Sequence, residues 1–398
     1  MFFSRYPPFV ALVVVGISAG NGACSRSAST TEGTAAAAVP GSTEAGAVGE
    51  GPSSARYGKI GDPVHLSVGY QPYYSEAWSG VVVDGLSLWK KYLPAGSTVE
   101  FSIGLQGSII VNAMLAGKEQ LGYLGDMPAI VGATKRETAD LRIIANIGLG
   151  HDQCNVFFAR NDAPRFADAK AAIRWLDGKT VAVPKGSCTD RFARAVFKKE
   201  NVEPGSYLNQ SIELITSGFR AAKLDAAVVW EPTASRLVAE GLARRVATGN
   251  DFGENDGAFI DARADLIQQR PDVVRGWLEA ELDAERYLAD PKNATAVARM
   301  AKQQTTGFDE KVLWRALFGA YPGAGESAIR LTIPFAFAPA SRELIQRSTA
   351  FLYEAKSIAI PELAADAIVP QFTDEILQKR GLSSPVAEVH AAADTGSP

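Results

Sequence analysis

The stretch GKTVAVPKGSCTDRFARAVF (178–197) predicts a strand, a turn and a helix in succession. Residues 180–183 are short, β-branched and bounded by breakers, as in a buried strand. Residues 184–186 make the turn, and Ser187 or Thr189 supplies the N-cap oxygen of the helix. Backbone N–H groups at such a helix start favour an anion. The same pattern is an ordinary βα connection in many α/β proteins, and its spacing matches neither a P-loop nor a dinucleotide fingerprint.

The N-terminal segment has the pattern of an export signal. Arg5 precedes an apolar run over 9–20, which is too short to span a bilayer, so residues 1–23 are expected to be a signal peptide. Cys24 follows Asn21-Gly22-Ala23, which resembles a bacterial lipobox except for Asn21, where an aliphatic residue is usual. We therefore expect a lipid on Cys24; the alternative is a plain cleaved signal next to an unpaired cysteine.

Two segments lack the large apolar residues that a core needs. Residues 24–57 are rich in Ser, Thr, Ala and Gly, which predicts a disordered tether, and residues 381–398 are expected to form a loose tail. A lipid anchor and a tether would hold the body outside the cell membrane, at the periplasmic or outer face.

Composition excludes several classes of protein. A formal net charge of -4 argues against a nucleic-acid partner. Three cysteines in a chain of 398 residues do not make a disulfide framework, and pairing of Cys154 with Cys188 stays open. The group His151, Asp152 and Cys154 matches no usual zinc spacing, so no metal and no cofactor are expected.

Strands and helices alternate from residue 65 to residue 240, and residues 265–355 read as mostly helical. This predicts an α/β fold with mostly parallel sheets covered by helices. One of the predicted strands is 212–215. Ligands of such sheets bind beyond the carboxyl ends of the strands. The loops at those ends supply the candidate ligand-binding residues, which are Gln71, Tyr74, Glu76, Trp78, Gln106, Asp126, Asp152, Ser187, Cys188, Thr189, Asp190, Ser217, Trp230 and Glu231.

Three segments carry a resemblance to a known family. LGYLGDMPAIVGAT (121–134), DGKTVAVPKGS (177–187) and KLDAAVVWEPTASRLVAEG (223–241) resemble the solute-binding components of ABC importers for nitrate, aliphatic sulfonates and taurine. The resemblance implies the type II periplasmic binding protein fold, with two lobes joined by two crossover strands. Lobe one would be 58–152 and 248–380, and lobe two 153–247. It also implies a receptor that is no enzyme, is a monomer, and delivers its ligand to an ABC permease and its ATPase.

In that family, sulfonates are held by backbone N–H and hydroxyl groups at helix starts, which match 187–190 and 106–108 here. The taurine binders place a carboxylate at the position of Glu231 to meet the amine. Because the loops are rich in acids, we expect a zwitterionic aminosulfonate, with its ammonium at Glu231 or Asp126. The alkyl part of the ligand would pack against the aromatic side chains of Trp78, Tyr73, Tyr74 and Trp230.

Each candidate also has a structural reading: a helix cap for Asp126 and Asp190, a cap or hinge for Glu231, and core packing for both Trp residues. Alternative ligands are a small cation such as an amine or a guanidine-like molecule, a metal complex, nitrate or bicarbonate. An enzyme resembling the pyrimidine-precursor synthases is a further alternative, as is a sensor without a transport role.

Overall fold

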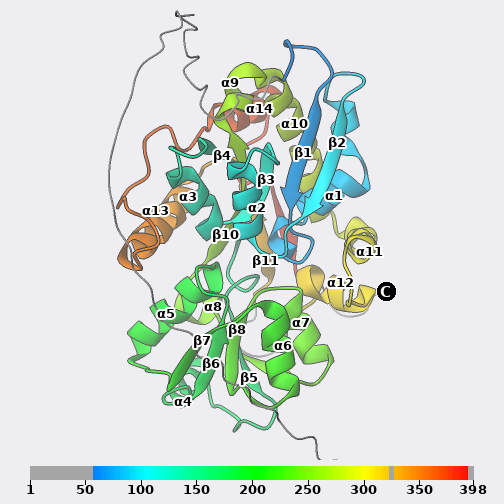
Figure 1. The fold of residues 1–398 in the computed structure, drawn as a ribbon. Helices are drawn as coiled ribbons and strands as arrows, with labels where there is room; N and C mark the ends of the chain where they lie inside the picture. The colour runs from blue at the N-terminus through cyan, green and yellow to red at the C-terminus, as the bar shows by residue number, and fades with distance from the viewer. Residues whose placement is uncertain (1–56, 322–326, 393–398) are drawn as a thin grey trace, which may run out of the picture. The chain divides into compact units, whose positions relative to one another are not determined.

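The computed structural model describes residues 57–321 and 327–392. The predicted signal peptide, Cys24 and all of the predicted tether before Tyr57 lie outside these residues. The described part contains two sheets that share no strand, one of seven strands and one of five. We call each sheet with its covering helices a lobe: lobe one is built on the larger sheet and lobe two on the smaller (Figure 1). The expected two-lobed α/β class is confirmed.

The sheet of lobe one has the strand order β12-β11-β4-β10-β3-β1-β2. Strands β2, β1, β3, β4 and β12 point one way, and β10 and β11 point the other. Five of the seven strands thus share one direction, but β10 and β11 make four of the six neighbouring pairs antiparallel, so the sheet is mixed. Its strands are β1 (His65–Tyr70), β2 (Thr98–Ile103), β3 (Leu121–Gly125), β4 (Leu141–Gly150), β10 (Asp256–Arg263), β11 (Ile329–Ile333) and β12 (Ala387–His390).

The central strands of this sheet read as continuous apolar runs because helices cover both of its faces. The helices of lobe one are η1 (Ser75–Ala77), α1 (Ser79–Gly85), η2 (Leu88–Lys91), α2 (Gly107–Leu115), α3 (Asp126–Thr134), α9 (Ala264–Gln269), α10 (Pro271–Ala289), η3 (Pro291–Asn293), α11 (Ala294–Gln304), α12 (Glu310–Phe318), α13 (Pro339–Glu354) and α14 (Gln371–Arg380). The expectation of a mostly helical stretch over 265–355 is thus confirmed, with β11 as its one described strand.

The sheet of lobe two has the order β7-β6-β8-β5-β9, in which only β5 runs against the others. Its strands are β5 (Val156–Arg160), β6 (Thr180–Val183), β7 (Ser206–Asn209), β8 (Ala226–Val229) and β9 (Ala243–Thr248). Its helices are α4 (Ala169–Trp175), α5 (Cys188–Glu200), α6 (Ile212–Arg220), α7 (Thr233–Ala239) and α8 (Gly249–Phe252). The predicted strand, turn and helix of 178–197 are confirmed as β6 and α5.

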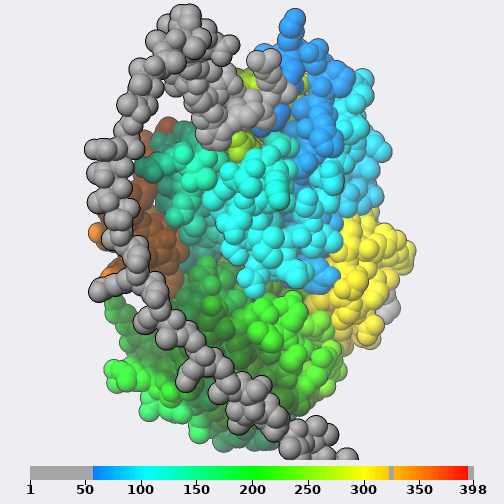
Figure 2. Space-filling view, in the orientation of Figure 1, coloured from blue at the N-terminus to red at the C-terminus, as the bar shows by residue number. Residues whose placement is uncertain are grey.

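The chain crosses between the lobes twice, from β4 to β5 and from β9 by way of α8 to β10. The end of β4 and the start of β10 pair with each other, from Asp256 opposite Gly150, so the two crossings lie side by side. In Figure 2 the surface of α2 meets the surface of lobe two along the boundary between the lobes. The candidate site lies at this boundary.

Two predictions about secondary structure are wrong. Residues 212–215 begin helix α6 rather than a strand: Ser211 caps the helix by accepting from Leu214 N, and Ile212, Ile215 and Phe219 bury one face at helical spacing. The expected loose tail is ordered over Ala387–His390, because this segment pairs with β11 as β12 and buries Val389.

None of the helices in the described ranges is long and apolar enough to cross a membrane.

Candidate functional site

A cavity of about 160 Å³ lies between the lobes, near the carboxyl ends of β1, β3 and β6. Lobe one lines it with Gln71, Tyr74, Gln106, Gly107, Ser108, Val111, Asn112, Gly125, Pro128 and Val131. Lobe two lines it with Pro184, Lys185, Gly186, Ser187, Cys188 and Trp230. A ligand here would touch both lobes, which is the geometry for closing one lobe on the other.

Three helix starts converge on this cavity. The N-cap residues are Gln106 for α2, Gly125 for α3 and Ser187 for α5, and all three belong to the lining. None of the three makes a side-chain hydrogen bond to its own helix end. The starts of α2 and α5 leave backbone N–H donors and positive partial charge facing the cavity, which favours an anion. At the start of α3, Met127 N donates to Asp126 and Pro128 has no N–H, so this end contributes little.

The hydroxyl of Ser187 is turned away from the N–H groups of its own helix. It donates to Pro184 O at 2.6 Å and contacts the hydroxyl of Thr189 at 2.7 Å. Thr189 is fully buried behind this contact. The two hydroxyls therefore hold the turn in shape, and the first N–H groups of α5 are left for a ligand.

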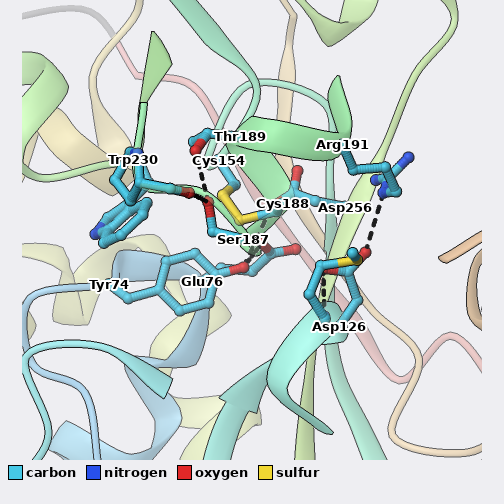
Figure 3. Close-up of a disulfide and its surroundings, with 12 residues drawn as sticks. Tyr74, Glu76, Asp126, Cys154, Ser187, Cys188, Thr189, Arg191, Trp230 and Asp256 are labelled. Atoms are coloured by element: carbon cyan, nitrogen blue, oxygen red, sulfur yellow. Dashed lines mark hydrogen bonds and ion pairs between the residues drawn. A yellow bond between two sulfur atoms is a disulfide. The ribbon is translucent and has the colours of Figure 1, made fainter. Parts of the chain in front are cut away.

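Aromatic and aliphatic groups form the rest of the wall. Trp230 lies beside Tyr74 (Figure 3), and its indole N–H donates to Tyr73 O at 3.0 Å, which joins lobe two to lobe one. Gln71 is held in place by a hydrogen bond from Nε2 to Tyr123 O at 3.0 Å. Lys185 is the one charged residue in the lining, and its ammonium lies 5.0 Å from the ring centre of Tyr207.

Cys154 and Cys188 form a disulfide, which settles the pairing that the sequence left open. It joins the segment entering β5 to the first residue of α5, with a Cα–Cα distance of 6.2 Å. Because Cys188 also lines the cavity, the disulfide ties the helix start at the site to the crossing between the lobes (Figure 3). In the described residues, the one cluster of metal-ligand types is these two cysteines with Asp256, and the disulfide removes both thiolates.

The five acidic candidates all lie outside the lining, although each is buried. Four have an arginine partner: Asp126 with Arg191, Asp152 with Arg330, Asp190 with Arg194 and Glu231 with Arg245. The fifth, Glu76, accepts from the hydroxyl of Tyr74. The acid-rich loops thus supply internal charge pairs, and the expectation that their carboxylates face a cationic ligand is wrong for this geometry.

Glu231 was predicted to bind the amine of a ligand, but its partners are groups of the protein itself. The residue is fully buried, its Oε2 accepts from Ser235 N at 2.9 Å, and its Oε1 lies 3.4 Å from Arg245. Burial raises the pKa of Glu231, and Arg245 and Arg330 lower it. A carboxylate engaged in this way caps helix α7 and balances the arginines, and it does not reach the cavity where an amine would bind.

Asp126 and Asp190 also act as structural groups near helix starts, which was the alternative interpretation for both. Asp126 accepts from Met127 N at 2.8 Å and from Ser348 at 2.8 Å, besides its arginine. Asp190 accepts from Gly186 N at 3.0 Å and from Tyr207 at 2.7 Å, which fixes the turn before α5.

Two further candidates lie away from the cavity. Trp78 is fully buried in the core, where its indole donates to Pro72 O at 2.9 Å, and Ser217 bonds Glu213 O on the exposed side of α6. The lining thus brings together Gln71, Tyr74, Gln106, Ser187, Cys188 and Trp230 from the predicted set.

The sequence analysis missed five lining residues: Val111 and Asn112 of α2, Gly125 at the start of α3, and Pro128 and Val131 of α3. Pro128 lies in the first turn of its helix, and Val111, Asn112 and Val131 lie in the second turn. The spacing of Gly107 to Val111 and Asn112 along the helix was the available signal, because residues one turn after an N-terminus share its face.

The comparisons with known proteins concern the family and the fold of the chain. Residues 61–302 match the family model described as the NMT1-like family. The taurine-binding periplasmic protein of Escherichia coli (strain K12) is 26% identical over 221 residues, which are 52% of this chain and 65% of that protein. The match therefore spans less than two thirds of this relative's length.

Two solved structures show the same fold. The alkanesulfonate-binding protein SsuA from Xanthomonas axonopodis pv. citri bound to MOPS aligns with a TM-score of 0.62 and 20% identity, covering 77% of this chain and 99% of that one. The desulfurization enzyme DszB aligns with a TM-score of 0.55 and 17% identity, covering 79% and 99%. The fold therefore occurs in a binding protein and in an enzyme.

Proposed function

The chain belongs to the NMT1-like family, and we propose that it is the extracytoplasmic receptor of an ABC importer, which its likeness to taurine-, alkanesulfonate- and nitrate-binding proteins supports. Its ligand would be a small organic anion, a sulfonate first of all, on which the two lobes close. A permease and its ATPase would take the ligand from the closed form. The receptor would act as a monomer, held at the membrane by a lipid on Cys24.

One observation carries the choice of ligand. The N-termini of α2 and α5, from opposite lobes, open on one cavity, and the described residues of its lining include Lys185 and no carboxylate. A sulfonate group has three oxygens to accept from these N–H groups, and its alkyl part would lie against Val111, Pro128 and Trp230.

The same lining favours a sulfonate without an amine over taurine. The acids that motivated a zwitterion are paired with arginines outside the cavity, so an ammonium group would lose its hydration without gaining a carboxylate partner. The alternative of a cation or metal complex loses its motivation for the same reason. Enzymatic activity has no support in the lining, where the one thiol candidate, Cys188, is in the disulfide.

A thermal-shift series on the purified full chain tests the proposal. The panel holds ethanesulfonate, taurine, nitrate, ethylamine and zinc at equal concentrations. We expect ethanesulfonate to raise the melting temperature most, since a ligand at a hundredfold excess over its dissociation constant stabilises the native state by about 2.7 kcal/mol. A shift with ethylamine or zinc alone would refute the anion assignment, and a larger shift with taurine than with ethanesulfonate would refute the preference against the amine.

A variant links the shift to this cavity. Trp230→Ala should abolish most of the shift with ethanesulfonate, since it removes the largest apolar wall on lobe two. The matched control is Trp175→Ala on α4, outside the lining, which should lower the melting temperature and leave the ligand-induced shift in place.

A further inference from the structure

Two carboxyl groups lie directly behind the lining of the cavity. Glu76 of η1 and Asp256 of β10, labelled in Figure 3, are both fully buried. The hydroxyl of Tyr74, a lining residue, bonds Glu76 and lies 3.2 Å from Asp256 Oδ2. Among the described residues, neither Glu76 Oε1 nor Asp256 Oδ1 has a hydrogen-bond donor. These two acceptor oxygens are therefore buried without a hydrogen-bond donor.

A shared proton resolves this arrangement. Two buried carboxylates side by side cannot both ionise, and a proton on one makes it a donor to the other. Burial raises the pKa of both groups. Glu76 raises the pKa of Asp256 further, to well above its ordinary value, whereas the hydrogen bond with Asp256 lowers the pKa of Glu76. The two carboxyls therefore titrate as one pair, with the shared proton held by Asp256.

The charged groups that face the pair come from several elements. Asp126 at the start of α3 raises the pKa of both carboxyls, and Asp152 after β4 raises that of Glu76. Arg191 of α5 lowers the pKa of Asp256. Arg191 and Arg330 are themselves bonded to Asp126 and Asp152, so their charge is divided between several acids. No arginine or lysine forms an ion pair with Glu76 or Asp256 in the described part of the chain.

The pair is close enough to the cavity to interact with a bound charge. Tyr74 is the one side chain that is both part of the lining and bonded to the pair. A carboxylate oxygen of Asp256 also lies within 4.8 Å of the sulfur of Cys188, which lines the cavity from the other lobe. The water-poor surroundings screen a charge at this distance only weakly.

We propose that Glu76 and Asp256 form a proton-linked pair that couples anion binding in the cavity to proton uptake. This rests on the proposed function, since it needs an anion as ligand. An anion next to Tyr74 makes a second negative charge on the pair more costly, so the pair holds its proton more tightly when the ligand is bound. By reciprocity the proton strengthens ligand binding to the same extent.

The affinity for the anion should fall as pH rises. Where the pair is protonated in both states, affinity is independent of pH. As pH rises past the pKa of the pair in the free protein, the free protein loses the proton that the complex keeps, so affinity falls. At full coupling of one proton, the dissociation constant rises about tenfold per pH unit. A receptor of this kind takes up its ligand best from acidic surroundings and releases it more easily when the pair ionises.

Calorimetry on the unaltered full chain measures the coupling directly. Ethanesulfonate is titrated at each pH from 5 to 9.5 in two buffers that differ in ionisation enthalpy, because this ligand stays anionic throughout. The difference in heat gives the number of protons taken up per ligand bound. We expect uptake of up to one proton in the upper part of this range, with an affinity that falls at least threefold over the pH units concerned. Binding without proton uptake at any pH would overturn the inference.

Variants assign the proton to this pair. The double variant Glu76→Gln with Asp256→Asn removes both carboxyls and should still bind ethanesulfonate while losing the dependence of affinity on pH. Each single variant leaves one buried carboxyl and should shift the pH range over which affinity changes. The control is Glu119→Gln, which removes another carboxyl whose pKa burial raises to about 7 but which lies outside the lining. It should keep the full pH dependence, and loss of the dependence in the control alone would refute the assignment.

The two proposals fail in different ways. If no anion of the panel binds at any pH, the proposed function is wrong. If ethanesulfonate binds with equal affinity and no proton uptake from pH 5 to 9.5, the proposed function stands and the coupling is wrong. The measurement on the unaltered chain decides this even where a variant does not fold.

Discussion

The lining of the cavity and the layer of side chains behind it differ in charge. The lining has the N-termini of α2 and α5 together with Lys185, and no carboxylate among its described residues. The layer behind it, which we call the acid layer, holds Glu76, Asp126, Asp152, Glu231 and Asp256, all buried. An anion can be held by the lining because arginines or a shared proton neutralise most of the acid layer. The number of acidic residues in a loop sequence therefore says little about the charge that surrounds a bound ligand.

Glu231→Gln should show most clearly that the acid layer affects stability and not ligand affinity. It leaves the buried Arg245 without its carboxylate, so the free energy of unfolding should fall by roughly 3–5 kcal/mol, measured by urea denaturation. The affinity of the folded protein for ethanesulfonate should not change. The control is Glu240→Gln, which breaks a more exposed pair with Arg220 and should cost less than about 1 kcal/mol. Weaker binding with unchanged stability would place Glu231 in the ligand site and undo the division between lining and acid layer.

Glu281 offers a buried acid remote from the cavity. Burial raises its pKa to about 7, while hydrogen bonds with Ser79 and Tyr123 lower it, so the native state favours its protonated form. Its contribution to stability is present below about pH 4.5 and is lost as pH rises through about 7, a loss of about 3 kcal/mol. Urea denaturation from pH 4 to 8 should show this fall, and Glu281→Gln should make the fall smaller; the other buried acids with raised pKa values account for the remainder.

The affinity for ethanesulfonate should show no dependence on Glu281, in contrast with Glu76 and Asp256. Glu279→Gln on the same helix serves as the control, because it breaks ion pairs with Lys379 and Arg380 but should leave the slope between pH 4.5 and 7 in place. If Glu281→Gln changed the pH dependence of binding, proton coupling would not be a property of the pair beside the cavity.

Lys185→Ala should have the smallest effect. Lys185 is exposed, so the loss of its charge should weaken ethanesulfonate binding by less than about 1 kcal/mol, or up to about fivefold. The difference from the unaltered chain should shrink at 1 M salt, where exposed charges are screened. Lys179→Ala is matched, since Lys179 also lies over an aromatic ring but outside the lining, and should leave calorimetric affinity unchanged. A loss of a hundredfold would mean that the lysine, not the helix N-termini, holds the anion.

The sequence alone determined the class of fold and the helix start at which the site is built. Local patterns are sufficient for these: β6 is a short apolar strand, a glycine turn follows, and α5 begins at Cys188. Ser187 and Gln106 were found by the same reasoning, because they precede helices at the ends of strands.

Only the tertiary structure decided the charge of the site, because that depends on partners far apart in the chain. Asp152 meets Arg330 across 178 residues, and Asp126 meets Arg191 from the other lobe. The pairing of Cys154 with Cys188 and the contact of Glu76 with Asp256 likewise bring together residues of different elements. The sequence identifies each ionisable group. The burial of that group and its neighbours in the folded protein decide whether it contacts a ligand, pairs with an arginine or holds a proton.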